Sequence, residues 1–426
     1  MGVPTPFHNK TAPLVKSMRW KEWSGYFAPE KYDTVHDNEY VLYRQTAGLL
    51  DISPLFKYDV RGKDAAHFLD RVMAREVSRL KQGQVAYSTW CDERGKCIDD
   101  GTVSVLGENW YRVTSANPSL RWFKINAHGF DVQLEDTSQR IAALALQGPT
   151  SRKILQQVSS APLDTLKFFH CVSDRVGGVP AVISRTGYTG DLGYEVWVEA
   201  KDAERLWDAI MEGGKHYGVG PAGLLALDMV RNEAGFILID VDYKSAKHAF
   251  TDEQKSSPYE IGLGWTVHLD RPAGREYFVG REALEREKTL GSAWTLVGLE
   301  IDWDELEAAY DAQDLPPHVP TTAWRSAIPI FDPRGDRQVG YATSGTWSPI
   351  LKKNIALATV ETPYAALGTP LKMEHMIEFK QALLTARVTK KPFFDPPRKK
   401  STIGTGKTAQ RNGGSSTTAT PQTART

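Results

Sequence analysis

A glycine-rich turn between two apolar runs constrains the fold of this chain most tightly. Residues 181–184 read Ala-Val-Ile-Ser, residues 194–198 read Tyr-Glu-Val-Trp-Val, and the segment 187–193 between them contains three glycines. Short apolar runs bounded by turn residues predict strands, and glycine allows the positive φ angles that a tight hairpin uses. We therefore predict a β-hairpin over these residues, which commits this part of the chain to a sheet.

The second strand of this hairpin carries a lone acid, Glu195. Side chains alternate along a strand, so Glu195 shares one face with Trp197 and lies opposite Tyr194 and Val196. A carboxylate beside a large aromatic ring can accept two hydrogen bonds from a flat, amino-bearing heterocycle, and Tyr188 could cover that ring. A solvent-facing strand residue explains this segment equally well, so both interpretations stay open.

A second pair of strand-like runs, at 84–93 and 97–106, joins through a turn at 94–96 and carries the acids Asp99 and Asp100. Adjacent strand residues point to opposite faces, so only one of these acids can enter a given pocket, and they cannot share a proton as a catalytic pair does. One carboxylate in a cleft could deprotonate or steer an amine nucleophile. An acid that accepts hydrogen bonds from nearby backbone amides is the structural alternative.

The run at 222–234 predicts a helix that carries Asp228 and Arg231 three residues apart on one face. Such a pair can simply form an ion pair along the helix. Next to a pocket, Arg231 could instead bind a ligand carboxylate through two parallel hydrogen bonds. The helix alone does not decide between these interpretations.

Charge and cysteine content exclude several classes of protein. The 426 residues hold 52 basic and 52 acidic side chains, so no overall field attracts nucleic acid or an anionic membrane. No apolar run approaches the roughly 20 residues that span a bilayer. The three cysteines lack metal-ligand or disulfide spacing. We expect a cytoplasmic protein without a bound metal and without a nucleic-acid or membrane partner; the cysteines are Cys91, Cys97 and Cys171.

Mixed α+β patterning runs through most of the chain. Strands are predicted within 47–60, 111–116 and 141–149, and helices over 64–80 and 201–217, where apolar residues recur at helical spacing. After Leu284 the pattern becomes rich in strands. We therefore expect a region of two intertwined α+β modules at 1–285 and a β-rich module at 286–395. Residues 396–426 hold one isoleucine and no aromatic residue, which predicts a disordered tail.

Eight segments, read together, resemble the glycine-cleavage T-protein family, the folate-dependent aminomethyltransferases. They follow the family's order and cover the chain to about residue 395, although each is weak alone. The segments lie at 43–53, 83–101, 145–149, 185–198, 223–235, 259–267, 278–284 and 343–360.

The resemblance implies a three-module cloverleaf fold with a β-barrel-like C-terminal module and tetrahydrofolate held in the centre. It implies that the catalytic aspartate is Asp99, the pterin-binding glutamate Glu195, the ring-contacting tyrosine Tyr188 and the ligand-facing arginine Arg231. In such an enzyme a carbon bonded to an amine nitrogen passes to tetrahydrofolate. The donor is a small molecule or a group carried on a lipoyl carrier protein.

Departures from the family pattern leave the donor open. Pro54 and Leu55 stand where the family has a histidine and a methionine near the folate, and Tyr26 replaces a tryptophan. A methylated amine or a methoxy compound is thus an alternative to a lipoyl-bound aminomethyl group. A folate-dependent demethylase of methoxy or sulfonium compounds is the second hypothesis, against which the retained Asp99 argues. A folate-binding accessory protein without transferase activity and the folate-binding half of an amine oxidase are the remaining alternatives.

Overall fold

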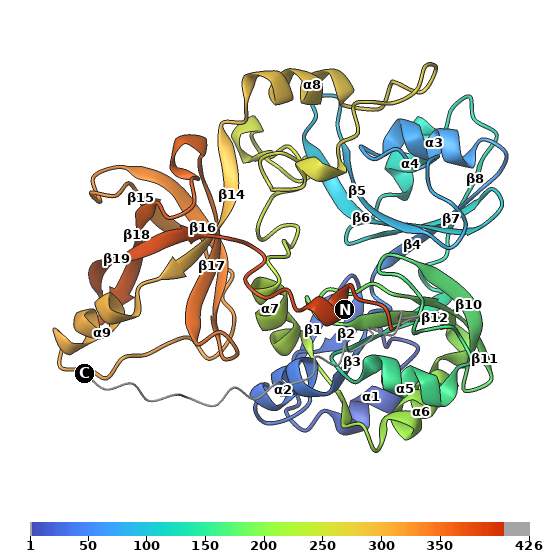
Figure 1. Ribbon diagram of the computed structural model, residues 1–426, viewed down its shortest axis with the longest axis horizontal. Helices are drawn as coiled ribbons and strands as arrows, with labels where there is room; N and C mark the ends of the chain where they lie inside the picture. The colour runs from blue at the N-terminus through green and yellow to red at the C-terminus, as the bar shows by residue number, and fades with distance from the viewer. Residues whose placement is uncertain (1, 404–426) are drawn as a thin grey trace, which may run out of the picture.

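Three lobes meet around a common centre in the computed structural model, which describes residues 2–403 (Figure 1). We name them the hairpin lobe, the aspartate lobe and the barrel. Each has its own sheet and its own hydrophobic core. The predicted α+β cloverleaf is therefore confirmed.

The hairpin lobe contains a six-stranded sheet in the order β10-β11-β12-β9-β3-β13. One face packs on helices α5 and α6 through Ile154, Leu206 and Trp207. The other face carries a smaller apolar group around Trp197, which packs against Leu224 of α7. The elements are β3 (Ala47–Asp51), β9 (Ile141–Gln147), β10 (Cys171–Val176), β11 (Val179–Ser184), β12 (Gly193–Glu199), β13 (Val219–Pro221), α1 (His8–Thr11), α2 (Asp37–Gln45), α5 (Ser151–Val158), α6 (Ala203–Gly214) and α7 (Leu224–Glu233).

The aspartate lobe contains a five-stranded sheet in the order β5-β6-β7-β4-β8. Helices α3 and α4 cover one face, where Trp90, Phe68 and Phe123 join one core. The opposite face is left for the centre of the molecule. The elements are β4 (Phe56–Arg61), β5 (Val85–Cys91), β6 (Cys97–Gly107), β7 (Trp110–Ser115), β8 (Gln133–Asp136), α3 (Ala65–Val72), α4 (Leu120–Asn126) and α8 (Arg281–Leu290).

The third lobe is a closed barrel with the strand order β14-β17-β16-β15-β18-β19, and closure removes its sheet edges. Its interior packs Leu299, Ile330 and Ala358, and α9 covers one side through Leu306. The elements are β14 (Trp294–Ile301), α9 (Trp303–Asp311), β15 (Ile328–Phe331), β16 (Gln338–Ser348), β17 (Lys353–Glu361), β18 (Pro370–Ile377) and β19 (Lys380–Thr389). A two-stranded ribbon of β1 (Trp20–Trp23) and β2 (Tyr26–Pro29) lies near the N-terminus.

Two predicted boundaries differ from the structure. The helix expected over 64–80 ends as α3 at Val72, because the backbone N–H of Ala74 donates to the carbonyl of Thr89 at 2.9 Å and that of Arg75 donates to the hydroxyl of Ser88 at 3.2 Å. These amides therefore have a partner outside any helix. The expected start of the β-rich module at 286 lies inside α8, and the first barrel strand begins at Trp294.

The C-terminal segment also differs from its prediction. Residues 396–403 are described and dock on the hairpin lobe, with a 3₁₀ turn over Pro397–Lys399. Composition predicted disorder because this segment has little apolar surface, but buried polar groups elsewhere in the chain bind it. The rest of the predicted tail, 404–426, lies outside the described residues.

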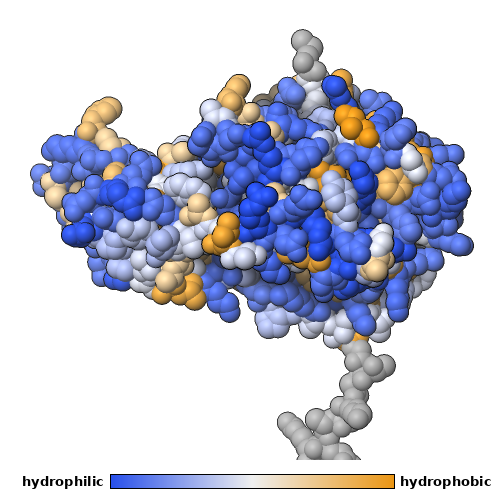
Figure 2. Space-filling view, turned by 90° about the horizontal axis from the view of Figure 1, so that it is seen from above, coloured by the Kyte–Doolittle hydropathy of each residue, from blue (hydrophilic) through white to orange (hydrophobic). Residues whose placement is uncertain are grey.

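One face of the molecule, seen from above, is mostly hydrophilic, with only small, scattered hydrophobic patches (Figure 2). Among the described residues, no helix is long and apolar enough to cross a membrane.

Candidate functional site

The predicted hairpin is present, and its glycines are required chiefly for space. β11 and β12 pair antiparallel, with Ser184 opposite Glu195. A Cβ atom at Gly187 or Gly193 would lie 1.9 or 2.0 Å from Oε1 of Gln147, whereas only Gly190 within the turn has a positive φ, +75°. The turn therefore wraps closely around the side chain of Gln147.

Gln147 holds the turn from inside. Its Nε2 donates to the carbonyl oxygens of Thr186 at 3.1 Å and Tyr194 at 3.2 Å, and its Oε1 accepts the hydroxyl of Thr189 at 3.1 Å. A buried amide with several partners on one loop fixes that loop's conformation. The segment 186–194 is thus a rigid element rather than a mobile tip.

Glu195 lies on the face of the sheet that points away from α5 and α6. It shares that face with Trp197, as the alternation predicted, and is partly rather than fully accessible. Burial raises the pKa of Glu195 to about 7, and a hydrogen bond from Thr186 acts in the opposite direction. Glu195 is therefore more enclosed than a solvent-facing strand residue.

Tyr188 at the start of the turn contributes a flat surface. Its ring stacks on Phe236, with centroids 5.6 Å apart and planes inclined by 21°, and its hydroxyl donates to the carbonyl of Ile237. Burial raises the pKa of Tyr188, Arg231 lowers it, and the charges of Asp242 and Asp100 raise it further. The segment 236–243 joins three distant parts of the chain, because it hydrogen-bonds to Tyr188, Arg231 and Asp100.

Asp99 and Asp100 point to opposite faces of β6, as predicted. Asp99 lies opposite Trp90, on the face covered by α3 and α4, and is fully buried. Its carboxylate accepts the backbone N–H groups of Asn117 at 2.9 Å and Asp100 at 2.8 Å. Burial raises the pKa of Asp99 well above its usual range, and the neighbouring charge of Asp100 adds to the effect.

Asp100 lies on the open face and is partly accessible. Its two oxygens accept hydrogen bonds from the hydroxyls of Tyr87 and Tyr243. Burial raises the pKa of Asp100, whereas the two tyrosine hydroxyls lower it. Tyr87 in turn stacks on Trp265, with ring centroids 6.2 Å apart.

The structure therefore brings Asp100, rather than Asp99, to the side where Tyr188 lies. Sequence alternation showed that only one of the two acids could face a pocket, but not which one. Tyr87 could have been found by the same alternation, since it lies on the face of β5 that Asp100 occupies on β6. No sequence pattern indicated Tyr243, which reaches Asp100 from a loop.

Arg231 is almost fully buried and forms ion pairs with Asp228 at 2.7 Å and Asp242 at 2.5 Å. The pairing along the helix that the spacing allowed is thus present, and a second carboxylate joins it. Within residues 2–403, Nη2 of Arg231 has no hydrogen-bond partner. Asp242 also accepts the hydroxyls of Thr343 and, at 2.6 Å, Ser344 in β16, so the barrel is tied to this arginine.

Lys391, which sequence analysis did not single out, lies beside this cluster. Burial lowers the pKa of Lys391 to about 8, although the charge of Asp242 acts in the opposite direction. A Cβ atom at Gly262 would lie 2.9 Å from its Nζ, and one at Gly235 would lie 3.2 Å from its Cβ. A partly buried cation therefore lies near Asp242, the carboxylate that also pairs with Arg231.

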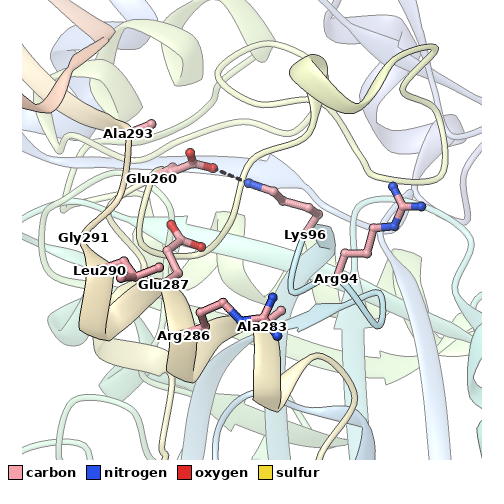
Figure 3. Close-up of a pocket in the computed structure, with 9 residues that line it drawn as sticks. All are labelled: Arg94, Lys96, Glu260, Ala283, Arg286, Glu287, Leu290, Gly291 and Ala293. Atoms are coloured by element: carbon pink, nitrogen blue, oxygen red, sulfur yellow. Dashed lines mark hydrogen bonds and ion pairs between the residues drawn. The ribbon is translucent and has the colours of Figure 1, made fainter.

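Two surface cavities lie on other parts of the molecule. One, of about 340 Å³, is bordered by Arg94, Glu287 and the Lys96–Glu260 ion pair at 2.8 Å (Figure 3). The other, of about 620 Å³, lies on the outside of the barrel beside Trp303 and Trp347. Within the described part of the chain, no group of three or more histidine, cysteine, aspartate or glutamate residues is placed to hold a metal ion.

Two family models match this chain. The GCVT N-terminal domain matches residues 6–271, and the glycine cleavage T-protein C-terminal barrel domain matches residues 316–395. The two matches include every residue of the cluster described above and most of the barrel.

Curated relatives extend over nearly the same length. An aminomethyltransferase from Desulforamulus reducens is 34% identical over 394 residues, which are 92% of this chain and 97% of the relative. An aminomethyltransferase from a Geobacillus species is 34% identical over 378 residues, 88% of this chain and 94% of the relative.

A solved structure has the same fold. The glycine cleavage system aminomethyltransferase T from Bartonella henselae superposes with a TM-score of 0.76 at 23% identity, over 93% of this chain and 99% of that one. The three-lobed arrangement is therefore shared with a known protein.

Proposed function

The chain belongs to the glycine cleavage T-protein family and is an enzyme of that family, and we propose that it transfers a one-carbon unit from an amine donor to tetrahydrofolate. The observation that carries the proposal is the segment 236–243, which hydrogen-bonds to Tyr188, Arg231 and Asp100 at the junction of the lobes. Glu195 follows the same turn on the centre-facing side of the sheet.

The residues present fit the pterin part of a folate. The carboxylate of Glu195 is partly accessible and has roughly four acceptor positions, which can receive N–H groups of a ligand. The stacked rings of Tyr188 and Phe236 offer an aromatic surface on the turn that precedes Glu195. Bound tetrahydrofolate would supply the amine nitrogen that accepts the carbon.

We assign the contact with the reacting nitrogen to Asp100. Its carboxylate is partly accessible and is fixed by Tyr87 and Tyr243, so it can take up or return a proton and balance positive charge without reorganising. Asp99, which the family resemblance indicated, is fully buried and holds the amide of Asn117. In this proposal Asp99 supports the end of β7 and the loop that follows.

Arg231 would donate a hydrogen bond to the ligand through one nitrogen only. Its Nε and Nη1 are engaged by Asp228 and Asp242, and Nη2 is buried without a partner among the described residues, so a ligand oxygen can reach it only when neighbouring side chains move aside. The two carboxylates also hold the guanidinium in one orientation, which reduces the entropy lost on binding. We keep Tyr188 as the residue that packs on the folate ring.

The function is tested by incubating the protein with tetrahydrofolate and a panel of donors, and then identifying the folate product. The panel comprises an aminomethyl-lipoyl carrier protein, methylated amines and methoxyaromatic compounds. Methylene-tetrahydrofolate formed from an aminomethyl donor is the expected result. Methyl-tetrahydrofolate from a methoxy compound would instead establish the demethylase alternative, and no product from any donor would contradict transferase activity.

The choice between the two acids is tested by the matched variants Asp100→Asn and Asp99→Asn. We expect Asp100→Asn to lower turnover by about 10²–10⁴-fold with folate affinity retained, the usual range for a lost acid–base group. Asp99→Asn should chiefly lower the thermal midpoint, because its new NH₂ group faces backbone donors. A larger loss of turnover in Asp99→Asn than in Asp100→Asn would return the catalytic role to Asp99.

A further inference from the structure

Residues 394–403, which we call the strap, leave the barrel after β19 and cross to the hairpin lobe (Figure 1). The match to the barrel family model ends at residue 395, so most of the strap follows the family domain. Nothing assigned to the folate site above lies on it. The strap nevertheless contacts both ends of the turn that carries Tyr188.

The first end is held by Arg185, which directly precedes the turn. Arg185 is fully buried, and its Nη2 donates to the strap carbonyl oxygens of Lys399 at 3.0 Å and Ser401 at 2.6 Å. Its Nη1 donates to the carbonyl of Leu166 at 2.7 Å. One nitrogen of this buried guanidinium, Nη2, therefore fixes the strap to the base of the turn.

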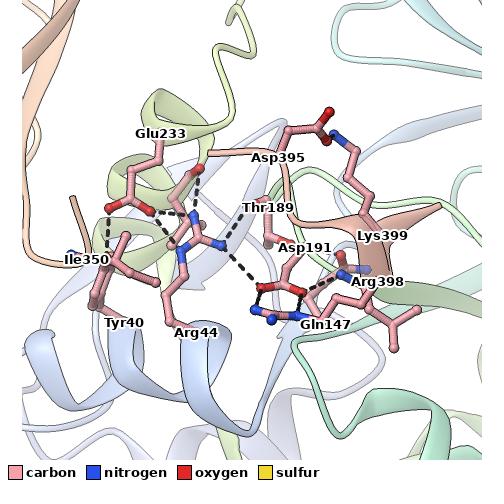
Figure 4. A network of polar contacts seen from close by, with 12 residues as sticks. Tyr40, Arg44, Gln147, Thr189, Asp191, Glu233, Ile350, Asp395, Arg398 and Lys399 are labelled. Atoms are coloured by element: carbon pink, nitrogen blue, oxygen red, sulfur yellow. Dashed lines mark hydrogen bonds and ion pairs between the residues drawn. The ribbon is translucent and has the colours of Figure 1, made fainter. Parts of the chain in front are cut away.

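The second end is held by Asp191, whose side chain is fully buried. Its two oxygens accept Nε of Arg398 at 2.6 Å and Nη2 of Arg398 at 2.7 Å (Figure 4). A bidentate pair between arginine and carboxylate is the strongest and most directional of the ordinary ion pairs. It closes the strap over the turn.

The opposite side of the turn is held by Arg44 of α2 (Figure 4). Arg44 donates to the carbonyl of Thr189 at 2.9 Å and to Glu233 at 2.7 Å, and its guanidinium lies over the ring of Phe394 at 4.4 Å. Glu233 also accepts the hydroxyl of Ser348 in the barrel at 2.6 Å. The turn is therefore clamped between a helix on one side and the strap on the other, and both are tied to the barrel.

The strap also reaches the aromatic surface of the site. Lys399 is only 6% exposed, and its Nζ lies 5.5 Å from the ring centroid of Phe236 and 2.7 Å from the carboxylate of Asp395. Phe236 is the ring on which Tyr188 stacks. Displacement of the strap would therefore remove contacts that hold the turn of Tyr188 and contacts that hold Phe236, the ring on which Tyr188 stacks.

We propose that the strap is a latch that holds the folate-binding turn in its binding conformation, with Arg398 as a positioning residue of the folate site. The inference rests on the proposed function, because it concerns the affinity of that site for tetrahydrofolate. If the closed strap favours folate binding, bound folate must favour the closed strap by the same factor. This reciprocity separates a latch from a contact that only stabilises the fold.

The test compares Arg398→Ala with Lys400→Ala in the full chain. Each variant removes one positive charge from the strap, but the side chain of Lys400 is 59% exposed and, within residues 2–403, forms a single ion pair, with Asp395 at 3.1 Å. We expect Arg398→Ala to weaken tetrahydrofolate binding about tenfold by calorimetry, within the common range of coupling between sites. Lys400→Ala should leave the affinity unchanged, and Arg398→Lys, which keeps a charge but not the bidentate geometry, should fall between them.

The second readout is hydrogen exchange of the strap amides. In the wild type, tetrahydrofolate should slow exchange at Ser401 and Ile403, which donate to the carbonyls of Pro397 and Asp164. In Arg398→Ala, exchange at these amides should be faster without ligand. The KM for tetrahydrofolate should rise while kcat stays near the wild-type value, because Arg398 does not contact Asp100.

The outcomes separate the two proposals. A wild-type protein that does not bind tetrahydrofolate would refute the proposed function itself. A wild type that binds it, together with equal affinity in Arg398→Ala or an equal loss in Lys400→Ala, would overturn the latch and leave the proposed function standing.

Discussion

Replacing Glu195 by glutamine should change the pH dependence of stability in a direction that the structure fixes. Burial raises the pKa of Glu195 to about 7 from an ordinary value of 4.5. At about 1.4 kcal/mol per pKa unit, this difference corresponds to about 3 kcal/mol. Because the folded protein holds this proton more tightly than the unfolded chain, the wild type loses that stability as the pH rises from about 4.5 through about 7.

The glutamine variant cannot lose a proton there and should keep its stability over this range. Urea unfolding of both proteins at several pH values between 4.5 and 8 measures the effect as the difference in free energy of unfolding. Between pH 4.5 and pH 8, the free energy of unfolding of the variant should rise relative to that of the wild type by up to about 3 kcal/mol. Parallel pH profiles would show that Glu195 titrates normally and would refute its burial in a low-dielectric site.

The same substitution makes a prediction about the ligand. The N–H groups of a pterin favour the ionised carboxylate, so tetrahydrofolate should bind the wild type more tightly as the pH rises through about 7. Glu195→Gln should bind more weakly above that pH, and its affinity should not follow the same titration. Calorimetry at pH 6 and pH 8 separates these behaviours, with binding enthalpies corrected for buffer ionisation.

Three further substitutions test the surrounding framework. Arg44→Met should lower the free energy of unfolding by about 3–5 kcal/mol, because it leaves Glu233 buried without its cation. A decrease below about 1 kcal/mol in urea unfolding would contradict this expectation. Gly101→Ala should lower the free energy of unfolding by about 1–3 kcal/mol, because its Cβ would lie 1.9 Å from the carbonyl oxygen of Thr114. An unchanged thermal midpoint would show that the two strands are not this close at Gly101. Tyr188→Leu should weaken tetrahydrofolate binding more than Tyr188→Phe, which keeps the ring, and equal affinities in the two variants would remove the stacking role.

Local patterns were sufficient to predict the hairpin and the strand pair. Alternation along β12 placed Glu195 and Trp197 on one face, and alternation along β6 separated Asp99 from Asp100. These inferences succeeded because a two-residue period is a property of the strand itself. Which face of a sheet is covered by helices depends on distant segments, so the choice of Asp100 over Asp99 required the structure.

Contacts between distant segments account for the other differences. The helix expected through residue 80 stops at Val72 because the amides of Ala74 and Arg75, which would continue it, donate to β5 instead. The strap was expected to be disordered because it has little apolar surface, but Arg185 and Asp191, about 200 positions earlier, supply buried polar partners. The composition of a segment indicates how much apolar surface it can bury. It does not indicate whether buried polar groups elsewhere in the chain bind that segment.

A crystal structure of the protein with tetrahydrofolate tests the central claim most directly. We expect the pterin on the carboxylate of Glu195, against the ring of Tyr188, with Asp100 rather than Asp99 within hydrogen-bonding distance of the ligand. Density for the ligand on another surface, such as the cavity beside Trp303 and Trp347, would contradict the account.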